Sequence, residues 1–260
     1  MMKKRIQVTA ALVLVCSVFG VLNGFCAGGY DLAADAKRKV GMSPEEVAWE
    51  LVLEQNLGNL YLPLYKKAKL AGREHDFDFV KDQPSLPRVL LIGDSISKGY
   101  TLPVRHALSG KANLHRAPAN CGSTAMGLKN LTVWLGKGKW DIIHFNFGIW
   151  NINTKDEVYA AELEKIVEQL KKTGAQLVWA RTTPAGDKGN AEGYTPAKCD
   201  RVNRIADAIM QKHGIPINDL YTAVAPKLAE LQKAKNVHFN AEGNLVLGKQ
   251  VAAVIQSHIK

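Results

Sequence analysis

The chain of 260 residues has few cysteines, and after residue 27 it has no apolar run long enough to cross a membrane. It contains no phosphate-binding loop and no Gly-x-Gly-x-x-Gly pattern after a strand, so no nucleotide cofactor is expected. No run of basic residues alternates with aromatic residues, which removes nucleic acid from the expected partners. The absence of these motifs favours a reaction that is carried out by amino-acid side chains alone.

The N-terminal residues 1–27 have the composition of a secretory signal peptide. The first five residues, "MMKKR", carry three positive charges, the residues up to about Phe25 are mostly apolar, and no acidic residue precedes Asp31. Small residues suited to cleavage follow near Cys26 and Ala27. We therefore expect an exported protein, periplasmic or secreted, with no stable membrane insertion after cleavage. A retained membrane anchor is the alternative.

Charge and cysteine content constrain the exported part further. Without the three basic residues of the signal peptide, 31 Lys and Arg remain against 24 Asp and Glu. This excess of positive charge suits a protein that acts near acidic polysaccharide or anionic lipid, although such charge usually only forms a solvated surface. Of the four cysteines, Cys121 and Cys199 lie beyond residue 27. Export permits a disulfide between them, and two buried free thiols are the alternative.

Residues 28–86 predict a helical N-terminal segment, called the leader below. Residues 43–46, Ser-Pro-Glu-Glu, have the pattern of a capped helix start. Val47, Leu51 and Leu57 follow at helical spacing and predict its apolar face. A second helical segment at residues 60–72 is expected to be interrupted by Pro63.

The stretch "EHDFDF" near the end of the leader contains His75, Asp76 and Asp78. Such residue types can bind a metal, but no complementary cluster of ligands follows them. We therefore expect these side chains to be structural or on the surface, and we expect no metal site.

From residue 87 to 260 apolar strand candidates alternate with amphipathic helices. The strand candidates are Arg88–Ile92, Asn113–Ala117, Asp141–Phe147, Gln176–Arg181 and Ile215–Asn218. The segments "WDIIHFNF" and "QLVWAR" are apolar enough for strands that are buried on both faces of a parallel sheet. The pattern predicts a single domain of the α/β class, with a parallel sheet flanked by helices.

Four segments stand at strand ends or before the last helix, where functional groups collect in an open α/β sheet. They are Gly-Asp-Ser at 93–95, "NCGST" at 120–124, "FGIWN" at 147–151 and "NVHFNAEG" at 236–243. Each is weak alone, because Gly-Asp-Ser and Gly122 suit ordinary turns and a lone histidine such as His238 is usually structural. Their joint presence in this order is more informative.

Together these segments resemble the SGNH, or GDSL-like, hydrolase family over about residues 87–259. The resemblance implies a flavodoxin-like three-layer α/β/α fold with a parallel sheet of about five strands, and an esterase without a cofactor. It makes Ser95 the nucleophile and His238 the base. It also implies that the backbone of Ser95 and Gly122 contributes to an oxyanion hole.

Two positions depart from the family pattern. Trp150 stands where the family has its donor asparagine, and Asn151 where it has aspartate. The oxyanion hole is therefore completed by the indole of Trp150 or by Asn151, or Trp150 only packs. Lys235 stands where the family has the acid that orients the base, and lysine cannot accept the imidazole N–H of His238. Asn236, its own backbone or a carboxylate from elsewhere then has to orient the ring. Otherwise the site is a bare Ser–His dyad or a diminished enzyme.

The roles of these residues also follow from their chemistry, without reference to the family. Ser95 at a strand-to-helix turn lies where free backbone N–H groups and the helix dipole favour developing negative charge. His238 can then take the Ser95 proton and return it to a leaving alcohol. Asp94 is expected to fix the turn, and His144, inside an apolar strand, is expected to be a core or support residue. Trp150, at a strand end, is a candidate for stacking on a sugar ring.

The sequence therefore predicts an exported serine esterase that hydrolyses short acyl esters, with acetyl foremost, on a carbohydrate substrate. The carbohydrate part rests on export and on the resemblance. A catalytically diminished glycan-binding protein, a lipid esterase and an enzyme that transfers acyl groups between glycans are the alternatives.

Overall fold

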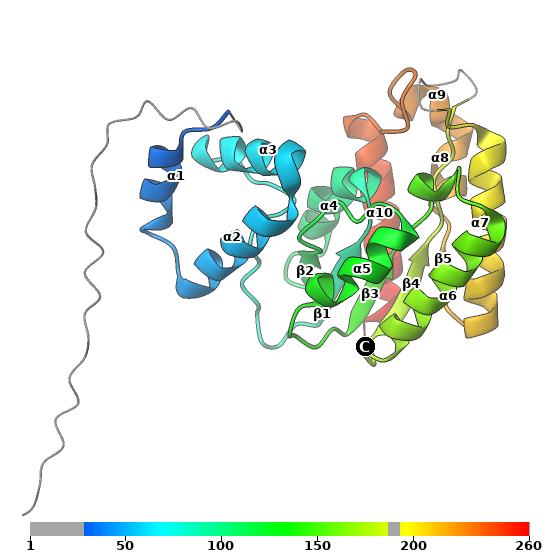
Figure 1. The fold of residues 1–260 in the computed structure, drawn as a ribbon, viewed down its shortest axis with the longest axis horizontal. Helices are drawn as coiled ribbons and strands as arrows, with labels where there is room; N and C mark the ends of the chain where they lie inside the picture. The colour runs from blue at the N-terminus through cyan, green and yellow to red at the C-terminus, as the bar shows by residue number, and fades with distance from the viewer. Residues whose placement is uncertain (1–28, 187–192, 260) are drawn as a thin grey trace, which may run out of the picture.

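The structure is a computed structural model that describes residues 29–186 and 193–259. Its N-terminal part holds three helices, α1 (Leu32–Lys39), α2 (Pro44–Asn56) and α3 (Gly58–Leu70). Strands and helices alternate in the rest of the described chain (Figure 1). The predicted signal peptide, residues 1–27, lies outside the described residues.

A parallel sheet of five strands forms the centre of the larger part, in the order β2-β1-β3-β4-β5. The strands are β1 (Arg88–Ile92), β2 (Asn113–Arg116), β3 (Ile142–Phe145), β4 (Gln176–Ala180) and β5 (Ile217–Asn218). The first has the predicted bounds, and the other four are shorter than predicted. The first residue after β2, β3 and β4 still donates its backbone N–H to a neighbouring strand, and the chain then enters the loops at the carboxyl edge of the sheet.

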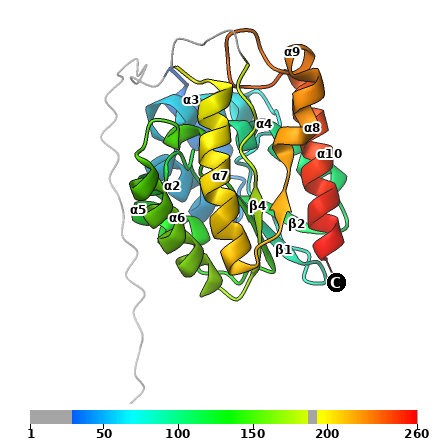
Figure 2. The ribbon, with the colours of Figure 1, turned by 90° about the vertical axis from the view of Figure 1, so that its right-hand side faces the viewer.

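Helices cover both faces of this sheet. One face carries α4 (Ser95–Ala107) and α10 (Ala241–His258), which pack on each other. The other carries α5 (Thr124–Leu135), α6 (Asp156–Lys171) and α7 (Pro196–His213), which lie side by side in Figure 2. Two short helices, α8 (Leu220–Val224) and α9 (Leu228–Leu231), precede α10. The predicted three-layer α/β/α class is thereby confirmed. Within the described ranges, every helix is too short or too polar to span a bilayer.

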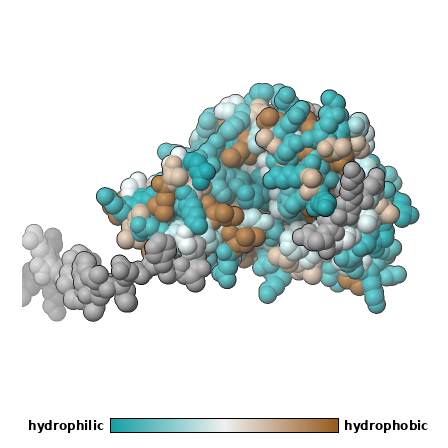
Figure 3. All heavy atoms as spheres, turned by 90° about the horizontal axis from the view of Figure 1, so that it is seen from above, coloured by the Kyte–Doolittle hydropathy of each residue, from teal (hydrophilic) through white to brown (hydrophobic). Residues whose placement is uncertain are grey.

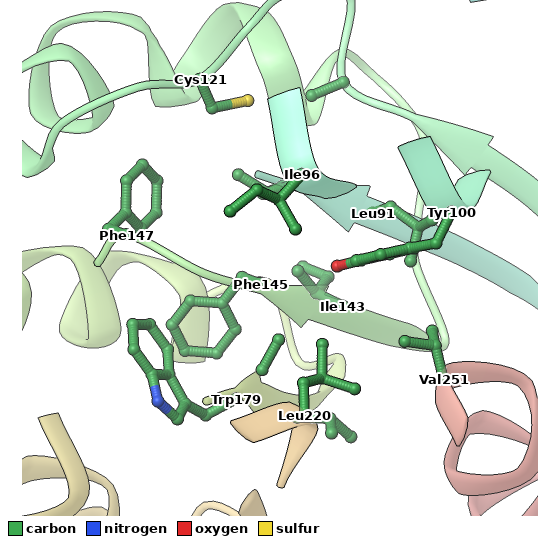
Figure 4. Close-up of a cluster of buried hydrophobic side chains, with 14 of the residues drawn as sticks. Leu91, Ile96, Tyr100, Cys121, Ile143, Phe145, Phe147, Trp179, Leu220 and Val251 are labelled. Atoms are coloured by element: carbon green, nitrogen blue, oxygen red, sulfur yellow. The ribbon is translucent and has the colours of Figure 1, made fainter. Parts of the chain in front are cut away.

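The strands are apolar because helices bury them on both sides. All four residues of β3 are buried, and the Phe145 ring meets the edge of Trp179 at a centroid distance of 5.2 Å (Figure 4). His144 is the one polar residue of this strand, and its Nε2 accepts a hydrogen bond from Asn218 Nδ2 at 3.1 Å. Burial lowers the pKa of His144 to about 3, so the ring stays neutral and serves the core.

Cys121 and Cys199 are both buried free thiols. Of the two alternatives that the sequence left open, the structure therefore has the one without a disulfide. Burial raises the pKa of the Cys199 thiol to about 11 and that of Cys121 to about 12, so neither is a thiolate near neutral pH.

The leader has a small hydrophobic cluster of its own, made of Leu53, Leu57, Tyr65 and Phe77. Ser43 caps α2 with the predicted reciprocal hydrogen bonds to Glu46. The leader helices therefore bury a core separate from that of the sheet.

A buried ion cluster joins the three leader helices. Lys66 on α3 is fully buried, and its Nζ lies 2.5–2.8 Å from carboxylate oxygens of Asp35, Glu50 and Glu54. Burial alone would lower the pKa of Lys66, but the hydrogen bonds to these carboxylates raise it above its ordinary value. The ammonium group occupies the position between the carboxylates that a metal ion would otherwise fill.

One expectation about the leader is wrong and another holds only in part. Helix α3 runs through Pro63 without a break, because packing of Tyr65 and Lys66 compensates for the single backbone hydrogen bond that proline removes. The predicted apolar face of α2 is correct at Leu57, which is buried, and wrong at Leu51, which is 50% exposed. Glu50 faces inward as well because it pairs with the buried ammonium of Lys66.

We expect Lys66→Met to lower the free energy of unfolding by about 3–5 kcal/mol, since it leaves buried carboxylates without their shared cation. Denaturant unfolding of the purified protein measures this difference. The neighbouring Lys67 is exposed, so Lys67→Met is a matched control that should change stability by less than about 0.5 kcal/mol. Equal stabilities of the two variants would show that the cluster is not a net support of the fold.

Candidate active site

The first segment of the site is the turn between β1 and α4. Gly93 and Asp94 follow the strand, and Ser95 is the first residue of the helix. The Asp94 carboxylate caps α4 by accepting the Ile96 N–H at 2.8 Å. Asp94 is buried, and this burial raises its pKa even though the hydrogen bond from Ile96 lowers it. Asp94 therefore fixes the turn, as the sequence predicts, and Ser95 stands at the helix N-terminus.

A buried arginine at the end of β2 binds the backbone of this turn. Arg116 is 2% exposed, and its Nη2 donates to the carbonyl oxygens of Gly93 and Asp94, both at 2.9 Å. Its Nη1 donates to Ser97 Oγ at 2.6 Å. The guanidinium group thus ties the backbone before Ser95 to the first turn of α4.

His238 reaches Ser95 from the loop between α9 and α10. Its Nε2 lies 2.7 Å from Ser95 Oγ. The loop is closed by a hydrogen bond from Lys233 N to the His238 carbonyl at 2.9 Å and by an isolated bridge between Gln232 and Phe239. Two residues that are 143 positions apart in the chain are therefore held in direct contact.

Asn236 orients the ring of His238. Its Oδ1 lies 2.5 Å from His238 Nδ1 and also accepts the backbone N–H of His238 at 3.0 Å. Because a carbonyl oxygen only accepts, Nδ1 carries the proton, and Nε2 is left as the acceptor for the Ser95 hydroxyl. Lys235 is exposed and has a left-handed backbone, with φ of 53°. Of the alternatives open from the sequence, the structure selects Asn236.

The loop after β2 brings Gly122 to the nucleophile turn. The N–H of Cys121 donates to the Gly93 carbonyl at 3.2 Å. Gly122 has a φ of 61°, and a Cβ atom there would lie only 2.6 Å from Met126 Sδ. The left-handed backbone is what favours glycine at this position, since the flexible Met126 side chain could move away from a Cβ atom.

Trp150 lies next to Gly122 in the loop after β3. A Cβ atom on Gly122 would be 3.7 Å from the indole ring, and Trp150 is 47% exposed. This loop approaches Thr182 so closely that a Cβ on Gly148 would lie 1.7 Å from Thr182 Oγ1. Asn146 holds the same loop, because its Nδ2 donates to the Ala180 carbonyl at 2.6 Å and its Oδ1 accepts the Gly148 N–H at 3.2 Å. Gly148 therefore permits the loop after β3 to approach the loop after β4 closely.

Asn151 has a structural position, which corrects the expectation that it completes the oxyanion hole. Its Oδ1 accepts the Thr124 N–H at 3.1 Å, and its Nδ2 donates to Thr124 Oγ1 at 2.8 Å and to Thr154 Oγ1 at 3.2 Å. Both amide hydrogens are used in this way, and the residue is 1% exposed. Asn151 joins the start of α5 to the loop after β3.

Sequence reasoning missed one residue that supports this site. Arg116 carries no local signal, because its partners lie at the end of another strand and on another helix. Residues 75–78, expected to be structural, link the leader to α4: Asp76 Oδ1 lies 3.2 Å from Lys98 Nζ. The strand "NLHR" ends in an arginine at a place where burial is expected, and this is a weak sign that Arg116 has internal partners.

Comparison with solved structures supports the fold. A lipase/acylhydrolase from Enterococcus faecalis is similar with a TM-score of 0.60 and 22% identity, over 67% of this chain and 97% of that chain. An acetylxylan esterase from Geobacillus stearothermophilus is similar with a TM-score of 0.55 and 17% identity, over 65% and 94%. A second acetyl xylan esterase gives 0.56 and 14%, over 65% and 99%. At these identities the likeness is evidence for the fold. No curated protein matches the sequence significantly.

A family model identifies the chain more directly. The model of the GDSL-like lipase/acylhydrolase family matches residues 91–246, which is more than half of the chain. The match spans the turn that holds Ser95, the Gly122 loop, the loop after β3 and His238. The chain belongs to the GDSL-like lipase/acylhydrolase family, with the SGNH fold, and is a carboxylic ester hydrolase.

Proposed function

We propose that this esterase is exported, acts through a Ser95–His238 centre and removes short acyl groups, with acetyl foremost, from a carbohydrate. One observation carries the proposal: Ser95 Oγ, the two ring nitrogens of His238 and Asn236 Oδ1 form a continuous chain of hydrogen bonds of 2.7 and 2.5 Å. This is the arrangement of a nucleophile, a base and a group that orients the base.

Acylation begins with a proton transfer. The Ser95 hydroxyl gives its proton to His238 Nε2 while Oγ attacks the carbonyl carbon of the ester. The resulting imidazolium is stabilised through Nδ1–H by the Asn236 carbonyl oxygen. The proton then moves from Nε2 to the leaving alcohol, and the acyl group stays on Ser95.

The negative charge that develops on the ester oxygen needs hydrogen-bond donors. The N–H of Ser95 points out of the first turn of α4, where helix N–H groups have no intrahelical acceptor. The Gly122 N–H in the adjacent loop is the second donor, and the α4 dipole adds to the effect. Water activated by His238 then attacks the acyl group and restores Ser95.

The glycan-binding alternative loses its main argument. It rested on Lys235, which cannot orient the base, but Asn236 performs this role from the adjacent position. A protein that only binds glycans needs neither the contact between Ser95 and His238 nor the orientation of the ring. The geometry therefore favours an active esterase.

A carbohydrate substrate is favoured by the surroundings of Ser95. The half-exposed indole of Trp150 beside Gly122 offers a flat apolar face on which a sugar ring can stack. The face of the molecule in Figure 3 is mostly hydrophilic, with scattered hydrophobic patches. Two of the similar structures are acetylxylan esterases. Together these features favour a sugar acetate over a long apolar ester.

Export rests on the sequence of residues 1–27. We expect the full chain, produced in a bacterial host, to be recovered outside the cytoplasm with its new N-terminus near residue 27. N-terminal mass spectrometry of the fractionated protein measures this. Recovery of the intact chain from the cytoplasm, or from the membrane with residues 1–27 retained, would contradict export as a free protein.

We expect the mature protein to hydrolyse 4-nitrophenyl acetate, and Ser95→Ala to lower kcat by a factor on the order of 10⁴ or more, because the substitution removes the nucleophile. Ser109 is exposed at the end of α4, so Ser109→Ala is the matched control and should retain full activity. Equal rates for Ser95→Ala and the wild type would contradict the proposal. Acetate release from acetylated polysaccharides, compared with release from long-chain esters, then separates a glycan esterase from a lipid esterase.

The role of Asn236 gives a separate prediction. Asn236→Ala should lower kcat by about 10- to 100-fold, since a hydrogen bond to a charged imidazolium contributes about 1.5–3 kcal/mol. Asn236→Asp should retain activity, because its carboxylate accepts the same hydrogen bond. Lys235→Gly is the control, since glycine suits the left-handed backbone there. Full activity of Asn236→Ala in a steady-state assay would remove Asn236 from the mechanism.

A further inference from the structure

A groove lies beside the loop that carries His238. Two segments of the chain, residues 225–230 and 233–236, line it together with Gly186 and Gln232. Its volume of about 620 Å³ lies within the range of about 300–1,000 Å³ that is usual for ligand sites. Helix α9, which contributes to the groove, packs on α10 (Figure 1). The groove is therefore large enough for a ligand and adjoins the segment between α9 and α10.

A buried glutamine fixes the shape of the groove. Gln232 is 9% exposed, and its Nε2 donates to the carbonyl oxygens of Pro184 at 2.9 Å and Val237 at 3.2 Å. Its Oε1 accepts the Gly186 N–H at 3.0 Å. The loop after β4 and the loop of His238 are thus joined by one side chain. The groove is formed before a ligand binds, which lowers the entropic cost of binding.

The charge of the groove is mainly positive. Lys227, Lys233 and Lys235 line it, whereas Glu230 is the one acidic residue among its described lining residues. All four side chains are exposed. None of the three lysines forms an ion pair with another described residue. A cleft that holds ammonium groups without paired carboxylates attracts anions.

The same groove adjoins the catalytic base. Asn236 lines the groove, and its Oδ1 holds His238 Nδ1. Lys233 is bound to this loop through its backbone, since its N–H donates to the His238 carbonyl at 2.9 Å and its carbonyl accepts the Asn236 N–H at 3.1 Å. An anion bound by Lys233 therefore lies next to the loop that positions the base.

The reaction places the alcohol part of the substrate next to this loop. His238 Nε2 returns its proton to the leaving alcohol, and in an ester of a carbohydrate this alcohol is the sugar. The ester oxygen that becomes negative lies instead at the N–H groups of Ser95 and Gly122. The sugar is therefore the part of the substrate that lies next to the His238 loop, whose residues 233–236 line the groove.

We propose that the groove is a substrate-binding subsite for acidic sugars, in which Lys227 and Lys233 bind the carboxylates of a uronate-containing polysaccharide while one of its acetyl esters lies at Ser95. The inference rests on the proposed function and narrows its substrate class to an acetylated acidic polysaccharide. The ion pairs select this polymer over a neutral one. Lysine suits the role because an ammonium group on a flexible stem can reach carboxylates at different places along a chain.

The test measures binding without turnover, by calorimetric titration of the mature protein with pentagalacturonate, which contains no ester. The double variant Lys227→Gln, Lys233→Gln should raise Kd by about 5- to 20-fold, because it removes two ion pairs with the ligand. Lys235 stays unchanged, since its left-handed backbone belongs to the turn that holds Asn236.

A charge-matched control separates the groove from the overall positive charge. Lys137 and Lys139 are exposed between α5 and β3, at the other edge of the sheet. The double variant Lys137→Gln, Lys139→Gln loses the same charge and should keep the Kd of the wild type. The proposal is overturned if the wild type binds neither pentagalacturonate nor an oligoglucuronate, or if both double variants lose the same affinity.

Kinetics separate this inference from the proposed function. On acetylated polygalacturonate, the Lys227→Gln, Lys233→Gln variant should raise KM by a similar factor with kcat little changed. Added NaCl should raise the KM of the wild type, because salt screens exposed ion pairs. A wild type that deacetylates xylan but binds no uronate keeps the proposed function and overturns this inference. A wild type that binds uronates through the two lysines but releases no acetate from any polymer confirms the acidic-sugar site and overturns the proposed function.

Discussion

The buried guanidinium of Arg116 is the group on which the rest of the site depends. A buried cation is stable only where its donors are satisfied and its charge is compensated. Arg116 meets the first condition at its two terminal nitrogens, which bind the carbonyl oxygens before Ser95 and the Ser97 hydroxyl, while its Nε has no hydrogen-bond partner among the described residues. The leader meets the second, since Phe77 covers the guanidinium and Asp76 lies 3.9 Å from its Nε. The nucleophile turn and the leader are therefore parts of one arrangement, joined through a single side chain of β2.

The sequence was sufficient for the fold class and for the principal residues of the site. Parallel strands buried on both faces appear as apolar runs, which made β1 and β3 predictable from "RVLLI" and "IIHF", whereas "NLHR" of β2 and the two residues of β5 give a weaker pattern. Because parallel strands place their carboxyl ends at one edge, residues as far apart as Ser95 and His238 could be assigned to one site before any coordinates were known. The strand ends were less predictable: the Asn146 N–H still binds the Ile92 carbonyl, while its side chain already holds the loop that follows.

What the sequence did not show depends on contacts between distant segments. The carboxylate of Glu50 faces inward because Lys66, on the next helix, neutralises it, and an apolar pattern cannot reveal a pairing of charges. Asn151 looked like a candidate donor, but its amide hydrogens are used by Thr124 and Thr154. The leader is bound to α4 through Arg105 and Lys98, and no periodicity or motif in the chain reports these contacts.

The two departures from the family pattern have different physical consequences. At the acid position, the substitution by lysine is compensated from the adjacent residue, since an amide oxygen at the right place accepts the imidazole N–H as a carboxylate does, although without a formal charge. At the donor position, the indole of Trp150 lies half in solvent beside Gly122. The leader is then more than an extension of the domain. Its removal would take Phe77 and Asp76 away from Arg116 and expose the guanidinium that holds the turn before Ser95, so the stability of the fold and the support of the nucleophile would be lost together.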